Sequence, residues 1–261
     1  MPHKALYSSM FTKAIQASYV TKLYKRCVRS ILPALFVLCI GGKARAQEMN
    51  LAGYDHTVLH FGFIIAINST NFVVQPVANL GSHFGDSLKS ISSQPETGFN
   101  LGIVAEAKIG KYLKLRFVPD LSFATRDLAY SFAGKDTFVI DKQVQSTFLD
   151  FPLDLKLISK RLNNLQVYVI AGGKYITDLA SQSNVDQSLA GANATVRLIR
   201  NDYAYEAGGG LQFFLPYFKF GIELKLSQGL RNLIIPDNTI YTQSIQTLKS
   251  KVFLISLCFE G

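Results

Sequence analysis

From Thr57 to the C-terminus, the chain repeats one pattern in which apolar and polar residues alternate. In the first run, Leu59, Phe61 and Phe63 share one face, while His60 and Gly62 share the other. A period of two is typical of β-strands, because successive side chains of a strand point to opposite faces. The pattern therefore predicts an all-β fold with strands at 57–68, 98–108, 112–126, 146–158, 165–175, 202–214, 218–227 and 248–259.

The links between these runs alternate in length. The first, third, fifth and seventh links have about 29, 19, 26 and 20 residues, and the others have about 3, 6 and 3. Outer-membrane barrels combine short periplasmic turns with long external loops. Tilted strands of about ten residues also match the thickness of a bilayer. We therefore expect 57–261 to form an eight-stranded antiparallel up-and-down transmembrane β-barrel.

The polar faces of the runs carry both acids and bases. A soluble barrel of the lipocalin type would turn these charges outward, whereas a membrane barrel turns them into its lumen. An eight-stranded barrel is narrow and filled by side chains, so opposed charges can fill it as ion pairs. The alternation of link lengths favours the membrane barrel. Its expected lumen charge network is Glu106, Arg116, Asp120, Arg126, Asp150, Asp154, Glu206 and Glu223.

The first 46 residues have the features of an export signal. Basic residues precede an apolar stretch at 31–40, and Ala44 and Ala46 supply the small residues of a cleavage site before Gln47. A bilayer-spanning helix needs about twenty apolar residues, so this stretch is too short for one. We expect a signal peptide at 1–46, a short N-terminal segment at 47–56, and export through the inner membrane to the outer membrane.

Charge and cysteine content exclude several classes of protein. The net charge is +9, but residues 1–46 contain eight basic and no acidic side chains, which leaves 19 basic against 18 acidic residues. A nearly neutral mature chain lacks the basic surface that nucleic-acid binding requires. A hydrophobic fraction of 48% is too high for a disordered chain. Cys258 stands alone once the leader is removed, so no internal disulfide is expected.

The histidines do not predict a metal site. His56 and His60 are four residues apart, which in a strand separates them by about 13 Å, and His83 lies in a predicted loop. Residues 208–210 are three glycines within a strand pattern, so they predict a close approach in the barrel wall and not a phosphate-binding loop. We expect no cofactor, and the sequence indicates no small-molecule substrate.

A lipid-modifying hydrolase would need a serine, a histidine and a carboxylate at the outer surface. His60, Ser69 and Glu106 offer these groups, but His60 is expected near the periplasmic end of its strand and Ser69 follows the external end. They do not meet in a barrel, so the sequence favours a protein without enzymatic activity.

Four segments resemble the PorT family of Bacteroidota: 60–68, 98–103, 115–123 together with Arg126 and Tyr130, and 150–154. The most specific is Leu-Arg-Phe-Val-Pro-Asp-Leu-Ser-Phe at 115–123. The resemblance implies an integral outer-membrane barrel of the type IX secretion system, which exports proteins with a C-terminal signal and is linked to gliding. It implies outer-membrane lipid and other secretion proteins as partners, and no catalytic residues. The alternatives are an OmpA-like structural or adhesion barrel and a lipid-modifying outer-membrane enzyme.

Overall fold

The computed structural model describes residues 50–51, 53–54, 57–78, 80, 88–132, 138–181, 196–237 and 240–261. The expected signal peptide at 1–46, with its cleavage-site residues Ala44, Ala46 and Gln47, lies outside the described residues. Among the described residues, no helix is long and apolar enough to cross a membrane.

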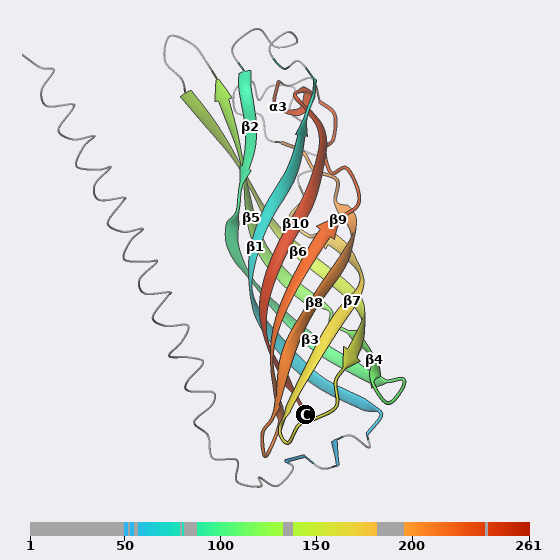
Figure 1. Ribbon diagram of the computed structural model, residues 1–261. Helices are drawn as coiled ribbons and strands as arrows, with labels where there is room; N and C mark the ends of the chain where they lie inside the picture. Colours follow the sequence, from blue (N-terminus) through green and yellow to red (C-terminus); the bar gives the residue numbers. More distant parts are fainter. Residues whose placement is uncertain are drawn as a thin grey trace, which may run out of the picture. The chain divides into compact units, whose positions relative to one another are not determined.

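Ten strand segments form one antiparallel sheet (Figure 1). They are β1 (Leu59–Pro76), β2 (Leu88–Gln94), β3 (Glu96–Lys108), β4 (Leu113–Phe117), β5 (Asp120–Phe132), β6 (Phe138–Ile158), β7 (Leu165–Asp178), β8 (Asn201–Phe214), β9 (Lys219–Gly229) and β10 (Ile245–Glu260), with one short helix, α3 (Ile240–Gln243), before β10.

Two pairs of segments act as single strands of the barrel. Pro95 separates β2 from β3, and Pro119 lies between β4 and β5. Proline has no N–H to donate to a neighbouring strand, which explains both interruptions. β6 pairs with both β4 and β5, and β3 does the same. The ten segments therefore make the eight strands that the sequence predicts.

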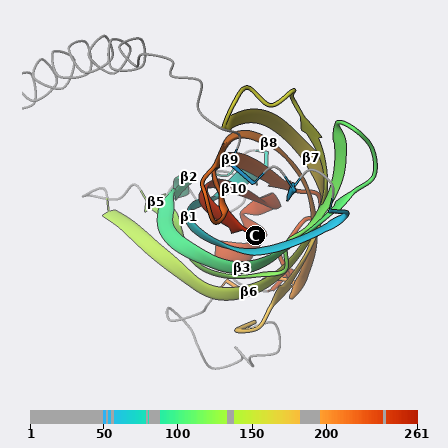
Figure 2. The same ribbon diagram turned by 90° about the horizontal axis from the view of Figure 1, so that it is seen from below.

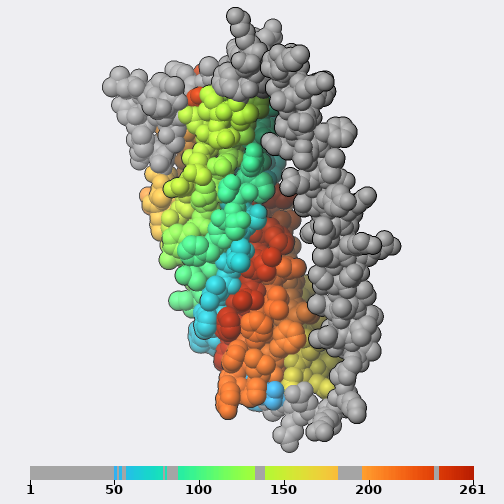
Figure 3. Space-filling model, turned by 90° about the vertical axis from the view of Figure 1, so that its left-hand side faces the viewer, coloured from blue at the N-terminus to red at the C-terminus, as the bar shows by residue number. Residues whose placement is uncertain are grey.

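The barrel closes where its first strand meets its last. β1 pairs with β10 from Gly62↔Glu260 to Pro76↔Ile245, and with β3 from Leu59↔Ala107 to Thr70↔Glu96. Seen along the axis, the strands surround an interior in a ring (Figure 2). The space-filling view shows the tilted bands of β1, in cyan, and β10, in red, side by side in the wall (Figure 3).

The two ends of the barrel differ. The connections 109–112, 159–164 and 215–218 are short and lie at the end where the chain terminates, here called the turn end. The strand ends that the other connections join lie at the opposite end, here called the loop end. Three of these connections, 77–87, 179–200 and 230–244, are longer than any of the turns, as predicted. The connection between β5 and β6, expected to have about 19 residues, spans only 133–137 because both strands extend into the expected loop.

Several strands are longer than the sequence pattern predicts. β1 continues to Pro76, β5 to Phe132 and β10 begins at Ile245, so parts of the expected loops at 69–97, 127–145 and 228–247 are strand. The sequence pattern does not predict these extensions because the inward face of the strands, which is polar at the turn end, becomes apolar toward the loop end. In β5 the inward residues change from Asp120 and Ser122 to Leu128 and Tyr130, without any change of alternation.

The outer surface of the turn-end half is an apolar band. Residues such as Ile65, Leu101 and Leu153 are exposed on it, and Leu153 is 51% exposed. Stacked or tilted aromatic side chains border this band at both ends, as in membrane barrels. The turn-end border contains Phe63, Phe213, Phe218, Phe220 and Phe259, and the loop-end border contains Phe99, Phe123, Phe151, Tyr175 and Tyr203.

The barrel interior as the candidate functional site

Ten charged side chains fill the turn-end half of the interior, and we call them the ion cluster. Strand alternation turns them inward, and register aligns them: Glu106 lies opposite Arg116, which lies opposite Asp154. Their five carboxylates balance their five cations, so the cluster is formally neutral. The members are Glu106, Lys114, Arg116, Asp154, Lys156, Glu206, Lys219, Glu223, Lys225 and Glu260, all buried.

Glu106 is shared by three lysines. Its carboxylate oxygens lie 2.5 Å from Nζ of Lys156, 2.6 Å from Nζ of Lys114 and 3.3 Å from Nζ of Lys219. Lys219 also forms an ion pair with Glu260. These side chains come from five different strands, β3, β4, β6, β9 and β10, so the shared carboxylate joins opposite parts of the wall across the interior.

A second group centres on Glu223 and Lys225. Glu223 pairs with Arg116 and accepts a 2.7 Å hydrogen bond from the hydroxyl of Tyr168. Nζ of Lys225 lies 3.0 Å from Asp154 and 2.9 Å from Glu206. All five carboxylates of the ion cluster therefore have a cation within ion-pair distance, which offsets much of the cost of burying charge.

The glycines of β8 make room for this arrangement. A Cβ atom at Gly210 would lie 2.5 Å from the carbonyl oxygen of Ile222 and 2.6 Å from the hydroxyl of Tyr168. At Gly208 it would lie 2.3 Å from the carbonyl oxygen of Leu224. The glycine run at 208–210 therefore serves close approach within the wall, in the way that the sequence suggests.

A polar layer lies above the ion cluster. Lys174 donates a 2.9 Å hydrogen bond to Asp150, and Asn100 donates a 2.6 Å hydrogen bond to Asp120. Asn68 in turn donates to Asn100 at 2.7 Å. Asp120 and Asp150, both expected in the lumen network, thus lie in this layer instead of in the ion cluster.

Arg126 lies apart from the other expected network residues. It donates a 3.1 Å hydrogen bond to Ser250 and lies over the rings of Phe72 and Phe148, at 5.0 and 4.5 Å from their centroids. It marks the level at which the interior changes from charged to apolar.

Apolar side chains fill the loop-end half of the interior, and we call them the apolar plug. Backbone hydrogen bonds join the connection around Leu198 to Ile234 and Leu233 to β10, which brings these segments into the barrel mouth. The members of the plug are Phe72, Leu88, Ile91, Leu128, Tyr130, Phe132, Val196, Leu198, Leu233, Ile234, Ile245 and Leu248.

A short segment before β1 crosses the opening at the turn end. Asn50 donates to the side-chain oxygen of Asn164 and to the carbonyl oxygen of Phe214, both at 3.0 Å, and Arg161 donates to the carbonyl oxygen of Asn50. Tyr54 is buried and donates a 3.3 Å hydrogen bond to Glu260. Burial raises the pKa of the Tyr54 hydroxyl above its ordinary value, so Tyr54 remains a neutral donor.

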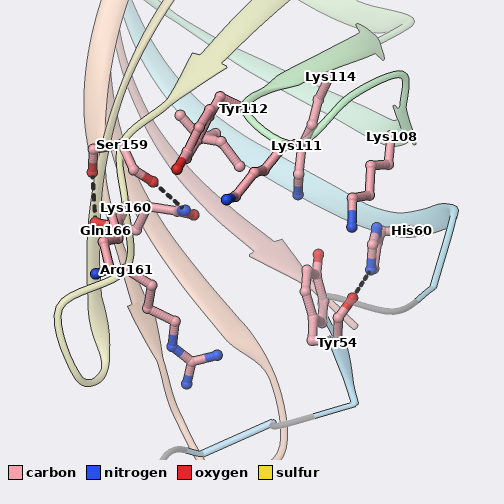
Figure 4. Close-up of a pocket in the computed structure, with 11 residues that line it drawn as sticks. Tyr54, His60, Lys108, Lys111, Tyr112, Lys114, Ser159, Lys160, Arg161 and Gln166 are labelled. Atoms are coloured by element: carbon pink, nitrogen blue, oxygen red, sulfur yellow. Dashed lines mark hydrogen bonds between the residues drawn. The ribbon is translucent and has the colours of Figure 1, made fainter.

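Beside Tyr54 lies a cavity of about 330 Å³ at the turn end (Figure 4). Lys108, Lys111 and Lys114 extend into it from one side, and the turn with Lys160 bounds the other. Two pockets toward the loop end, one beside Gln143 and one beside Arg126, have volumes of only about 20 and 10 Å³. A space that small holds about one water molecule.

Sequence reasoning missed several of these residues. Alternation places six of them on the polar faces of their strands, although the predicted lumen network does not include them: Lys114, Lys156, Tyr168, Lys174, Lys219 and Lys225. Glu260 continues the inward series of Ser256 and Cys258, one residue beyond the predicted strand end. No periodicity signals Tyr54, because it precedes the first strand.

The structure offers no catalytic triad at the positions considered. His60 and Glu106 are neighbours in register, but Ser69 is nine residues along β1, about 30 Å away. Among the described residues, no three His, Cys, Asp or Glu side chains are placed to hold a metal ion. His56 and His83 lie outside the described residues.

Comparison with known proteins identifies the family. Residues 46–234 match the model of the outer membrane protein beta-barrel domain family. The chain belongs to this family. It resides in the outer membrane. In barrels of this kind the short turns face the periplasm and the long loops face outside. No curated protein matches the sequence.

Several solved structures of outer-membrane barrels are similar to this chain at low identity. OprG from Pseudomonas aeruginosa is 13% identical with a TM-score of 0.40, and the match covers 78% of this chain and 94% of OprG. Ail, the attachment invasion locus protein of Yersinia pestis, is 11% identical with a TM-score of 0.34, over 78% and 100%. AlkL, solved in lipid bilayers, is 11% identical with a TM-score of 0.35, over 84% and 94%.

Proposed function

We propose that this protein is a closed outer-membrane anchor that works by contact with other proteins of a secretion system and has no enzymatic activity. The observation that carries the proposal is the filled interior. The ion cluster occupies the turn-end half and the apolar plug occupies the loop-end half. An exported protein is far wider than an eight-stranded interior, so this barrel does not itself form the export channel.

The type IX secretion system is the assembly that the sequence resemblance favours. Two features of the resembling segments have clear structural uses here. Arg116 of the 115–123 segment pairs with Glu223, and Pro119 allows the break between β4 and β5. Tyr130 of the same resemblance lies fully buried in the apolar plug. Residues of the segments that resemble the PorT family therefore have structural roles inside this barrel, which supports the proposed assignment.

The contact surfaces that we propose lie at the two ends. Tyr217, in a turn at the turn end, is 89% exposed and is available to a periplasmic partner. At the loop end, β5 and β6 extend beyond the aromatic border and present polar residues such as Asp141, Gln143 and Gln145 outward. A photo-crosslinking residue at position 217 or 143 tests which end binds other proteins.

Deletion of the gene is the decisive test. We expect the deletion strain to lose export of proteins with a C-terminal signal, and the wild-type gene to restore it. Loss of one surface attachment with export intact would instead support the OmpA-like adhesion function. We also expect the purified protein to give no large, stable conductance in planar bilayers. Wide, stable pores would contradict the closed anchor.

A further inference from the structure

Asp120 of the polar layer differs from the other inward carboxylates around it. The five carboxylates of the ion cluster, and Asp150, each have a lysine or arginine within ion-pair distance. Asp120 is only 6% exposed, yet among the described residues its carboxylate accepts a hydrogen bond from Asn100 and pairs with no cation. A buried carboxylate without a counter-ion is so costly that such a group normally becomes neutral.

A second carboxylate faces Asp120. Asp120 and Asp150 are directly opposite each other in the register of β5 and β6, and the side chains of such a pair lie close together. Oδ2 of Asp150 lies 2.9 Å from Nζ of Lys174, whereas its Oδ1 is buried and has no hydrogen-bond partner among the described residues. A single ion pair therefore accompanies two opposed carboxylates. Two like charges at this separation disfavour the ionisation of one of them.

The other cations of this region form contacts elsewhere. Lys225 of β9 interacts electrostatically with Asp120, but its Nζ lies 3.0 Å from Asp154 and 2.9 Å from Glu206. Arg126, further along β5, donates its hydrogen bond to Ser250. The positive charge that Asp120 lacks is therefore not supplied by either of these side chains.

We propose that Asp120 is a proton-binding site in the lumen, which takes up a proton from water and, as a neutral acid, donates a hydrogen bond to Oδ1 of Asp150. A protonated carboxyl group has one O–H donor, which a carboxylate lacks. The proton completes a chain of hydrogen bonds: Asn68 donates to Asn100 at 2.7 Å, and Asn100 donates to Asp120 at 2.6 Å. The remaining charge of Asp150 is balanced by Lys174, so the polar layer becomes neutral, as the ion cluster is. The inference does not depend on the secretion role.

The first test is infrared spectroscopy of the folded mature chain in phosphatidylcholine vesicles at neutral pH. A protonated carboxylic acid has a carbonyl stretch that a carboxylate lacks and that shifts in heavy water. We expect this band in the wild type, and Asp120→Asn should lose the intensity of a single acid. The control Asp141→Asn, at an exposed position of β6, should keep the full band. A band of unchanged intensity in Asp120→Asn overturns the proposal. A wild-type spectrum without the band also overturns it, whether or not the variant folds.

The second test measures stability against pH. Aspartates of an unfolded chain are ionised at neutral pH, so only the folded barrel binds this proton. The folded state is then stabilised as the pH falls from alkaline to mildly acidic values, and this stabilisation is lost as the pH rises. We expect the urea midpoint to rise on acidification in the wild type and in Asp141→Asn. The rise should be smaller in Asp120→Asn, whose amide resembles the neutral acid. An equal rise in Asp120→Asn and the wild type contradicts a proton at Asp120.

Discussion

The two halves of the barrel interior are built by the same strands from opposite chemistry. At the turn end, inward positions of β4 and β6 hold Arg116, Asp154 and Lys156, which pair with charges across the lumen. At the loop end, inward positions of β5 and β10 hold Leu128 and Leu248, both fully buried in the apolar plug. The wall is continuous, but its filling changes from ion pairs to a hydrophobic core.

The outer surface changes in the opposite sense at the same level. Along β6, the outward residues are Leu157, Leu155 and Leu153 in the band, and then Gln145, Gln143 and Asp141 toward the loop end. The medium outside explains the reversal. Lipid requires apolar side chains on the surface and leaves the polar ones for the lumen, whereas water at the loop end favours an ordinary apolar core. One strand therefore turns its apolar side chains outward in the half that faces lipid and inward in the half that faces water.

The largest effect is expected at the shared carboxylate of the ion cluster. Glu106→Gln leaves Lys114 and Lys156 facing each other without their common partner. Loss of one member of a buried ion pair should lower the free energy of unfolding by about 3–5 kcal/mol. The chain has no tryptophan, so unfolding in urea is followed by gel mobility or circular dichroism. The control is Glu96→Gln on the same strand, expected below about 0.5 kcal/mol. Equal losses would contradict the importance of the cluster.

The polarity of the outer surface is tested on a single strand. Leu153→Arg places a charge in the apolar band and should cost about 2–4 kcal/mol of folding free energy. Gln143→Arg faces outward from the same strand beyond the band and should be neutral within about 0.5 kcal/mol. The measurement is the urea midpoint of folding into lipid vesicles. If both variants fold equally well, the boundary between the two halves is wrongly placed.

The apolar plug should respond as a protein core does. Leu128→Ala removes a fully buried side chain and should lower the free energy of unfolding by about 2–3 kcal/mol. This lies in the lower part of the usual range, since the neighbouring connections can partly fill the cavity. Leu230→Ala, an exposed residue at the same end, serves as the control. Equal free energies of unfolding for the two variants would contradict a stabilising role of the apolar plug.

The smallest effect concerns packing inside the wall. Gly210→Ala brings a methyl group against Ile222 and Tyr168 and should cost about 1–2 kcal/mol. Gly173→Ala on β7 meets only the carbonyl oxygen of Ala204, at 3.9 Å, and should be tolerated. Thermal unfolding of the two variants, followed by gel mobility, measures the difference. Equal stability of the Gly210→Ala and Gly173→Ala variants would contradict the need for close approach at Gly210.

Much of the fold could be read from alternation and link lengths. The eight strands, their antiparallel order and the turn end were predicted, and the chain belongs to an outer-membrane barrel family. Leu153 and Asp154 lie on the outer and inner surfaces, respectively, as their alternation predicts. The alternation does not predict the strand extensions, because the polar and apolar faces of a strand exchange sides toward the loop end. The scaffold role and the type IX assignment remain proposals.

The sequence by itself determined which residues share a face. Side chains of a strand point alternately to its two faces, so the alternation of residue types along the chain is sufficient to assign them. Only the tertiary structure decided which inward charges meet. Glu106 and Lys219 are 113 positions apart, and their contact depends on the register and closure of the whole barrel. The same closure decided that Arg126 lies beneath the apolar plug instead of within the ion cluster. Local periodicity carries no information about distances across a lumen, and those distances decide the pairs.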